Sequence, residues 1–95
     1  MTATTGRIVG VDLQDSEDNR AVIDAIEADN SDVKVTYLPG LVKLSCPGEL
    51  VVRRSSVEER LGRQWETPEF QMAIVSYIGG IAEWDDDHLV IRWEH

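Results

Sequence analysis

Apolar and polar residues alternate in several short stretches, which is the pattern of a strand that buries one face and exposes the other. Val9, Val11 and Leu13 alternate in this way near the start of the chain. Farther on, Pro39-Gly40 separates two more alternating stretches and is a typical turn signal. The alternation predicts strands at residues 7–13, 33–37, 42–46, 49–53, 81–84 and 89–93.

A helix is predicted between the first two strands. Apolar residues at positions 22, 25 and 26 recur at helical spacing and would form its buried face. Asp15 or Ser16 can cap its start, and the polar residues 30–32 can end it. The first half of the chain therefore has the order strand, helix, strand, strand.

Two shorter helices are predicted in the second half. Ser55 with Glu58, or Ser56 with Glu59, can form a capping box at the start of the first. Gly62 can end that helix in a left-handed conformation, which glycine adopts readily. Both Ser–Glu registers are possible, so the sequence leaves the first residue of this helix open.

The next helix is predicted to begin at Thr67-Pro68, with Thr67 as its N-cap. Gly79-Gly80 would stop it. The apolar residues at helical spacing that would form one face are Phe70, Ala73, Ile74 and Tyr77. For Tyr77, burial in the core and exposure at a binding surface are both open at this point.

The predicted fold class is α+β. We expect a single small domain built from two strand-helix-strand-strand units, with a mostly antiparallel sheet and short helices. Residues 1–6 are small and polar and are expected to be a flexible N-terminus, and residues 7–95 are expected to form the domain.

Composition narrows the classes of partner. The chain has 95 residues and a net charge of −9, from 18 acidic and 9 basic side chains. This balance argues against nucleic acid, because phosphate binding needs a basic face. It permits a basic protein partner, although acidic residues also simply keep small proteins in solution. A single cysteine, the absence of an apolar run long enough to span a membrane, and an N-terminus unlike a secretory signal predict a cytoplasmic location.

The sequence offers little catalytic chemistry. Its two histidines, His88 and His95, do not follow a glutamate at the Glu-x-x-His spacing of diiron sites. The run from Asp85 to His88 is metal-like in composition, but adjacent residues point in different directions, so an exposed hairpin turn is the better interpretation. Cys46 lies in a strand pattern without a basic neighbour and is expected to be buried. We therefore predict no catalytic, cofactor-binding or metal-binding residues.

The tryptophans could be binding anchors or core residues. Trp93 shares the phase of its strand and is expected in the core, whereas Trp65 is expected to pack beneath the two short helices. Trp84 adjoins the acidic turn and is expected to be exposed. Leu41 lies beside a turn and is also expected to face solvent.

Four motifs in the second half occur in a distinctive order: V-E-E-R-L-G-R-Q-W at 57–65, S-Y-I-G-G at 76–80, W-D-D-D-H at 84–88 and L-V-I-R-W at 89–93. This set resembles the small coupling, or effector, proteins of bacterial soluble diiron monooxygenases, which hydroxylate phenol, toluene, alkenes or methane. The resemblance implies a cofactor-free, non-catalytic protein. Such a protein binds the diiron hydroxylase of its system, which also contains an NADH-dependent reductase, and promotes productive oxygen activation and substrate hydroxylation or epoxidation.

The resemblance also implies which residues bind the hydroxylase. In the family, the helix before the I-G turn and the turn itself face the partner, which maps here to Gln71, Val75, Ser76, Tyr77, Gly79 and Gly80. Expected exposure adds Leu41, Glu83 and Trp84. Replacing Gly79 with tryptophan is expected to leave the fold intact and to weaken hydroxylase binding.

Two other classes of function remain possible from the sequence. One is a ferredoxin-like regulatory domain that binds a small ligand, or a homo-oligomeric interaction module, because strands and short helices fit it equally well. The other is a small enzyme that uses His88 and the run Asp85–Asp87.

Overall fold

The computed structural model describes residues 7–93, so the predicted flexible segment 1–6 and the histidine at position 95 lie outside the described residues. The elements are β1 (Ile8–Gln14), α1 (Glu17–Asp29), β2 (Lys34–Leu38), β3 (Leu41–Pro47), β4 (Glu49–Arg53), α2 (Arg54–Leu61), α3 (Pro68–Ala73), β5 (Ile74–Ile78), β6 (Gly80–Trp84) and β7 (His88–Arg92). The α+β class is confirmed.

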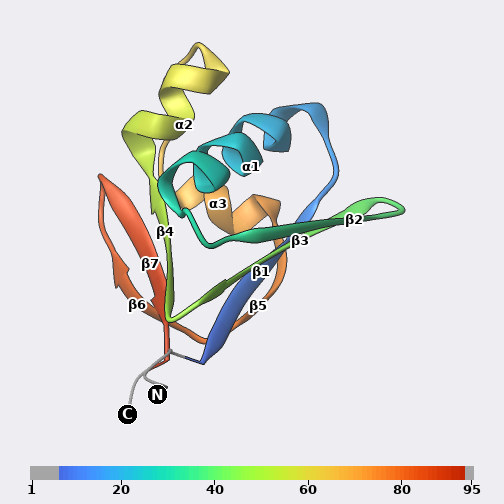
Figure 1. Cartoon of the computed structure of the whole chain (residues 1–95). Helices are drawn as coiled ribbons and strands as arrows, with labels where there is room; N and C mark the ends of the chain where they lie inside the picture. Colours follow the sequence, from blue (N-terminus) through green and yellow to red (C-terminus); the bar gives the residue numbers. More distant parts are fainter. Residues whose placement is uncertain (1–6, 94–95) are drawn as a thin grey trace.

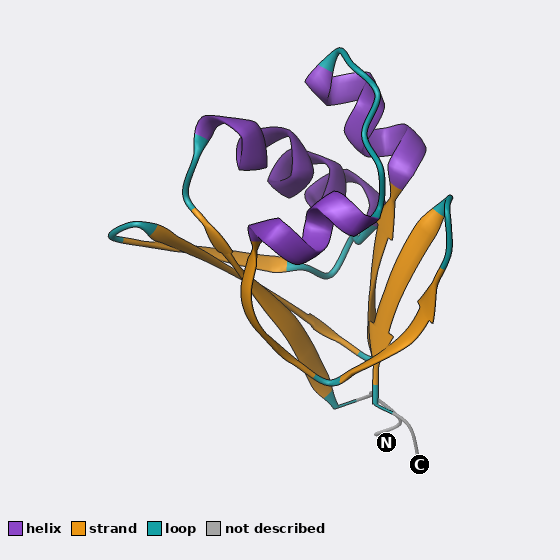
Figure 2. Cartoon of the chain, turned by 180° about the vertical axis from the view of Figure 1, so that it is seen from behind, coloured by secondary structure: helices purple, strands orange, loops and turns teal. Residues whose placement is uncertain are grey.

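The strands form two antiparallel sheets. The first has the order β2-β3-β1-β5, and the second has the order β4-β7-β6. The sheets meet near the start of β1 and the end of β7 and diverge toward the helices (Figure 1). From behind, the three helices gather over the opening between the sheets (Figure 2). The strand β5 belongs to the first sheet although it follows the helices of the second half, so the two halves of the chain share one core.

The core lies where the inner faces of the sheets meet the helices. The alternating residues of β1 and β3 that were predicted to point inward are buried. Each of them pairs across the sheet with another buried residue. Burying side chains of this size contributes about 1.5–3 kcal/mol each. The core residues of the sheets and helices include Val9, Val11, Leu13, Val22, Ile26, Val42, Leu44, Leu50, Val52, Phe70, Leu89 and Ile91.

Helix α1 begins and ends through side-chain hydrogen bonds. The Ser16 hydroxyl accepts a hydrogen bond from the Asn19 backbone N–H at 3.2 Å, so Ser16 is the N-cap. The Glu17 and Asp18 carboxylates lie in the first turn, where the helix dipole favours negative charge. Asn30 is the C-cap and is buried, and its side chain also bonds to β4.

The predicted capping box of α2 is wrong. The helix begins at Arg54, and within residues 7–93 its N-cap, Arg53, makes no side-chain capping bond. The Glu58 carboxylate instead accepts hydrogen bonds from the Trp65 backbone N–H at 2.8 Å and from Arg54 Nε at 3.1 Å. The predicted left-handed end is confirmed, because Gly62 has a φ of 79°.

The predicted extent of the last helix is also wrong. Helix α3 ends at Ala73, and the residues expected to continue it form strand β5, which pairs with β1. Ile74 and Val75 are β-branched and favour a strand once a neighbouring strand is available. Gly79 is therefore a link between the two sheets and not a helix stop. Thr67 is the N-cap residue and Pro68 lies in the first turn, as predicted, but the Thr67 hydroxyl makes no capping bond and donates to the Asp85 carbonyl at 2.7 Å.

The aromatic and cysteine predictions have mixed outcomes. Trp65 is 3% exposed and packs in the core as predicted, Trp84 is exposed, and Cys46 is buried. Burial, with smaller effects from the nearby carboxylates of two acidic residues, raises the pKa of the Cys46 thiol above its ordinary value. Trp93 is only partly buried at the rim of the core, where its indole N–H donates to the Ile8 carbonyl at 3.0 Å. Leu41 is half-buried and does not project freely into solvent as expected.

Candidate docking surface

The most exposed apolar stretch of the second half runs along strands β5 and β6. Each is an edge strand of its own sheet, so residues 74–84 form one continuous border, which we call the edge segment. Val75 is 55% exposed, Tyr77 46% and Trp84 37%. Exposed large apolar side chains on edge strands are candidates for protein binding, and tyrosine and tryptophan are enriched among the residues that anchor protein interfaces.

Gly79 joins the two halves of the edge segment in a conformation that other residues rarely adopt. Its φ is +121°, and a Cβ added there would lie 3.0 Å from Val9 Cγ1 and 3.1 Å from Ile91 Cγ2. A side chain at Gly79 would therefore enter the core between the two sheets. The expectation that a tryptophan at this position leaves the fold intact is wrong.

Strand β5 is fixed to the first sheet by a polar bridge. The Ser76 hydroxyl donates to Asp12 Oδ2 at 2.8 Å, and Lys43 Nζ lies 3.2 Å from the same oxygen. Asp12 thus connects β5 to β3 across β1. The bridge holds the backbone of β5 in place, so the exposed side chains of the edge segment project from a supported strand.

The hairpin between β6 and β7 is held by the imidazole of His88. Its Nε2 lies 2.8 Å from Glu83 Oε1, and its Nδ1 lies 3.3 Å from Asp85 Oδ1. The hydrogen bond to Glu83 raises the pKa of His88 above its ordinary value, and the neighbouring aspartates add to this effect. Asp85 Oδ1 also accepts the backbone N–H groups of Asp87 and His88, which lower the pKa of Asp85.

This geometry predicts a pH-dependent hairpin. Because the folded pKa of His88 is raised, its ion pairs stabilise the fold below the ordinary histidine pKa of about 6.5, and this contribution is lost as the pH rises through the folded value. We expect the melting temperature to fall slightly between about pH 6 and about pH 8, and His88→Gln to flatten this part of the profile. Thermal melts of both proteins would measure it, and identical slopes would contradict it.

Asp85 and His88 of the metal-like run at 85–88 bond to each other within the hairpin between β6 and β7. Among residues 7–93, no three His, Cys, Asp or Glu side chains are placed to hold one metal ion.

The same part of the chain contains no helix that is long and apolar enough to cross a membrane.

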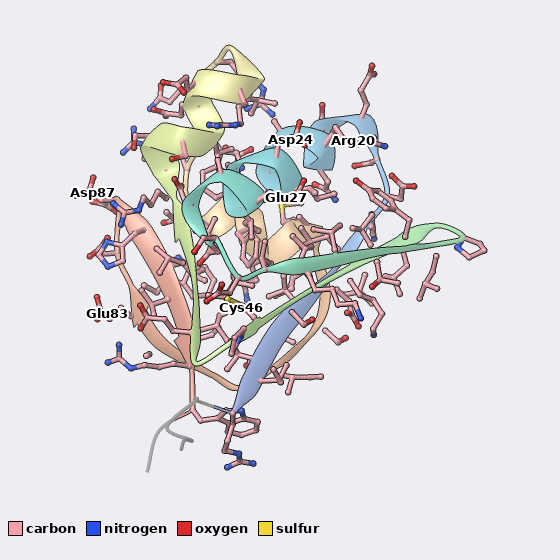
Figure 3. The ribbon with its side chains drawn as sticks, viewed as in Figure 1. Arg20, Asp24, Glu27, Cys46, Glu83 and Asp87 are labelled. Carbon is pink, nitrogen blue, oxygen red and sulfur yellow. The ribbon has the colours of Figure 1, made fainter. Side chains whose placement is uncertain are left out.

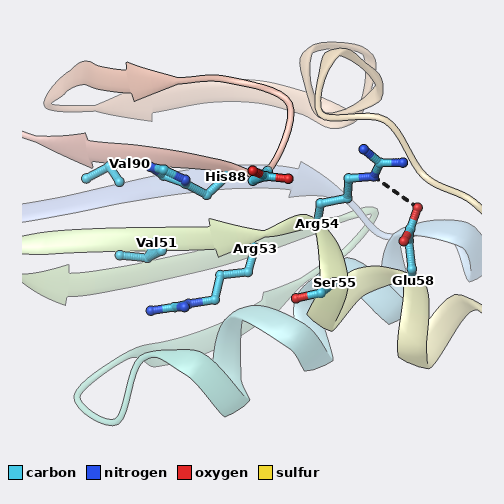
Figure 4. Close-up of a pocket in the computed structure, with 8 residues that line it drawn as sticks. Val51, Arg53, Arg54, Ser55, Glu58, His88 and Val90 are labelled. Atoms are coloured by element: carbon cyan, nitrogen blue, oxygen red, sulfur yellow. Dashed lines mark hydrogen bonds and ion pairs between the residues drawn. The ribbon is translucent and has the colours of Figure 1, made fainter.

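An open cleft of about 530 Å³ lies between β4, β7 and the start of α2 (Figure 4). Val51 and Val90 line it together with charged side chains. Two of those charged side chains already have partners, because Arg54 pairs with Glu58 and His88 is held by the hairpin carboxylates. The pKa of Glu58 is lowered mainly by the Trp65 backbone N–H and also by Arg54. We interpret this region as a structural junction between α2 and the second sheet.

Most of the residues that the sequence analysis proposed for docking lie in the edge segment. The edge segment contains Val75, Ser76, Tyr77, Gly79, Gly80, Glu83 and Trp84. Gln71 is exposed on α3, just before the segment. Leu41 is separate, because it lies at the start of β3, on the other side of β1 from β5. Ile78 and Ile81 are also exposed in this segment and were not among the predicted docking residues. Ile78 fell within the predicted helix, and Ile81 lay in a predicted strand whose exposed face the sequence did not identify.

Comparison with known proteins identifies the family. Residues 7–92 match the MmoB/DmpM family, which is nearly the whole chain. The chain belongs to the MmoB/DmpM family. Within this family, it is 34% identical over 88 residues to the stimulatory component DmpM of phenol 2-monooxygenase from Pseudomonas sp. (strain CF600), covering 93% of this chain and 97% of that protein.

Solved structures of MmoB/DmpM relatives have the same fold. One chain of a phenol hydroxylase–regulatory protein complex superposes with a TM-score of 0.86 at 31% identity, covering 93% of this chain and 100% of that chain. The soluble methane monooxygenase regulatory protein B superposes with a TM-score of 0.72 at 21% identity, covering 99% of this chain and 70% of that chain. This second likeness concerns the fold alone. The resemblance read from the motifs at 57–93 is thus confirmed.

Proposed function

We propose that this chain is the regulatory component of a multicomponent diiron monooxygenase. It binds the hydroxylase of its system and promotes productive oxygen activation and substrate hydroxylation or epoxidation, without a cofactor or reaction of its own. The observation that carries this proposal is the match to a phenol 2-monooxygenase stimulatory component over almost the full length of both chains. A small-ligand domain or a homo-oligomeric module has no comparable observation in its favour.

The physical basis of this function is differential binding. A regulatory protein changes the hydroxylase only if it binds one hydroxylase conformation more tightly than another. The corresponding coupling free energies are typically about 1–3 kcal/mol. This chain supplies that energy through contacts alone, and the oxygen and substrate chemistry takes place in the partner.

The edge segment is the surface proposed to bind the hydroxylase. Its supported backbone and exposed aromatic side chains suit a rigid contact, because little conformational freedom is lost when it binds. A stable interface of standard size covers about 800 Å² on each partner. The segment would supply the apolar centre, with Gln71 and Glu83 at its polar rim.

The remaining partner of the proposed system is an NADH-dependent reductase that delivers electrons to the hydroxylase. The net charge of −9 would speed encounters with a basic partner surface and contribute less to affinity. A cytoplasmic location, where NADH is available, fits this role and stays a prediction.

A direct binding measurement tests this proposal. The hydroxylase of the same system is recognised by its paired Glu-x-x-His motifs, and its purified form would be titrated with this chain by calorimetry. We expect saturable binding near one copy for each active site. If the titration gives no heat change and the chain does not co-elute with the purified hydroxylase on a sizing column, the proposed function is wrong.

Replacing Val75 with glutamate is expected to weaken hydroxylase binding by about tenfold or more, because a charge would be buried in an apolar contact. Val75 is exposed, so the fold should tolerate the change. Ala28→Glu, on the exposed side of α1, is the matched control and should bind like the wild type. Equal affinities for the two variants, with unchanged circular dichroism, would exclude the edge segment as the contact.

A further inference from the structure

The first sheet has an outer face that none of the helices in residues 7–93 covers (Figure 2). The side chains of β1 that point away from the core, such as Ile8 and Asp12, project from it. Pairing across the strands places two rows of residues on this face, and we call them together the outer face. One row is Lys34, Ser45, Gly10 and Ile78, and the other is Thr36, Lys43, Asp12 and Ser76.

A hollow of about 150 Å³ lies on the outer face at Gly10, with Ile8, Ser45 and Ile78 among its lining residues. Gly10 carries no side chain because a Cβ there would lie 2.7 Å from the Leu44 carbonyl oxygen. The two isoleucines beside the hollow are more than half exposed. A hollow with apolar walls on an exposed sheet is a site into which a partner can insert one apolar side chain.

The charge of the outer face differs from that of the rest of the chain. Lys34 and Lys43 are the only lysines in the sequence, and both line the hollow. Asp12 is its one acidic residue and is already paired with Lys43, whereas Lys34 makes no ion pair with any described residue. In the rest of the sequence 17 acidic residues outnumber seven arginines, and Asp24 and Glu27 on α1 are two of the exposed acidic residues (Figure 3).

The outer face is also continuous with the proposed docking surface. Ser76 and Ile78 belong to the edge segment by sequence, and their side chains lie in the two rows of the outer face. A partner that covers β5 from its edge would therefore reach the hollow at Gly10 without a gap.

We propose that the outer face is a second contact with the hydroxylase, which presents carboxylates to Lys34 and Lys43 and inserts one apolar side chain into the hollow at Gly10. This inference rests on the proposed function and extends it from the edge of the sheet to its face. Complementary charge supports this choice, because a carboxylate-bearing surface would be repelled by the acidic helix α1 and attracted here.

Filling the hollow tests the apolar part of the contact. Ser45 lies directly opposite Gly10, and a phenylalanine there can cover the glycine, an arrangement that stabilises sheets. Ser45→Phe is therefore expected to keep the fold and to bind hydroxylase about tenfold more weakly. Ser31→Phe, in the exposed turn after α1, is the matched control and should bind normally. Normal binding by a folded Ser45→Phe variant would overturn the proposed insertion.

Amine labelling tests the charged part, since any lysine modification reports only on Lys34 or Lys43. Both are expected to be labelled quickly in the free chain and at least about fivefold more slowly in the saturated hydroxylase complex. Unchanged labelling in a saturated complex would overturn this proposal and leave the proposed function standing, whereas no binding by the wild-type chain would overturn both. Protection that arises without hydroxylase, at high chain concentration, would assign the face to a second copy and also contradict the proposal.

Discussion

Replacing Asn30 with alanine is expected to lower the free energy of unfolding by about 2–4 kcal/mol, because it leaves the half-buried N–H and carbonyl of Val51 without the partner they have in Asn30. The Asn30 amide donates to the Val51 and Ile26 carbonyls at 2.8 Å each, and its oxygen accepts the Val51 N–H at 2.9 Å. Strand β4 is an edge strand, and the side chain of Asn30 takes the place of a neighbouring strand. Urea denaturation of both proteins would measure the change.

Asn30→Asp is the control for this prediction. Its carboxylate keeps the acceptor for the Val51 N–H but turns a negatively charged oxygen toward the Ile26 and Val51 carbonyls at a buried position, so at neutral pH this variant should be at least as destabilised as Asn30→Ala. An alanine variant as stable as the wild type would show that β4 does not depend on this side chain.

Replacing Gly79 with alanine is expected to destabilise the fold by about 2–4 kcal/mol, through backbone strain and overpacking together. The φ of +121° is unfavourable for alanine, and the new methyl group would press on Val9 and Ile91. Thermal or urea denaturation would measure the loss.

The neighbouring glycine provides the comparison. A Cβ at Gly80 would meet only the Arg92 carbonyl oxygen, at an ordinary contact distance of 3.4 Å. Gly80→Ala is therefore expected to change stability by less than about 1 kcal/mol. Equal effects at the two positions would contradict the assignment of Gly79 as the structural link.

Because Gly79 supports the fold, weaker binding by Gly79 variants would not map the interface. Weaker binding by Val75→Glu would map it.

Local patterns in the sequence were enough to predict most of the fold. The alternation in β1, β3 and β7 and the capped helix α1 agree with the structure, because each buries one face of a regular element. The boundary between α3 and β5 could not be found in this way. Phe70, Ala73 and Ile74 fit helical spacing, and only pairing with β1, far away in the sequence, makes the chain a strand from Ile74 onward.

The roles of individual polar residues were harder to predict. Glu58 was considered as a helix-capping residue, but its carboxylate binds the Trp65 N–H seven residues farther along. That bond, the left-handed Gly62 and the buried Trp65 make residues 57–65 one local structural unit, in which each of these residue types has a specific role. The family resemblance implied docking residues between Val75 and Gly80, and expected exposure added Glu83 and Trp84. The edge strand β5 that carries the first of these, and the outer face, require knowledge of which strands are neighbours.

We propose that this chain acts by binding a hydroxylase and favouring its productive state. The most direct test is to titrate the chain into its purified hydroxylase and reductase while NADH consumption and product are followed together. We expect product per NADH to rise and to saturate near one copy of the chain for each active site. A ratio that stays flat across the titration, although the chain is folded and binds, would contradict it.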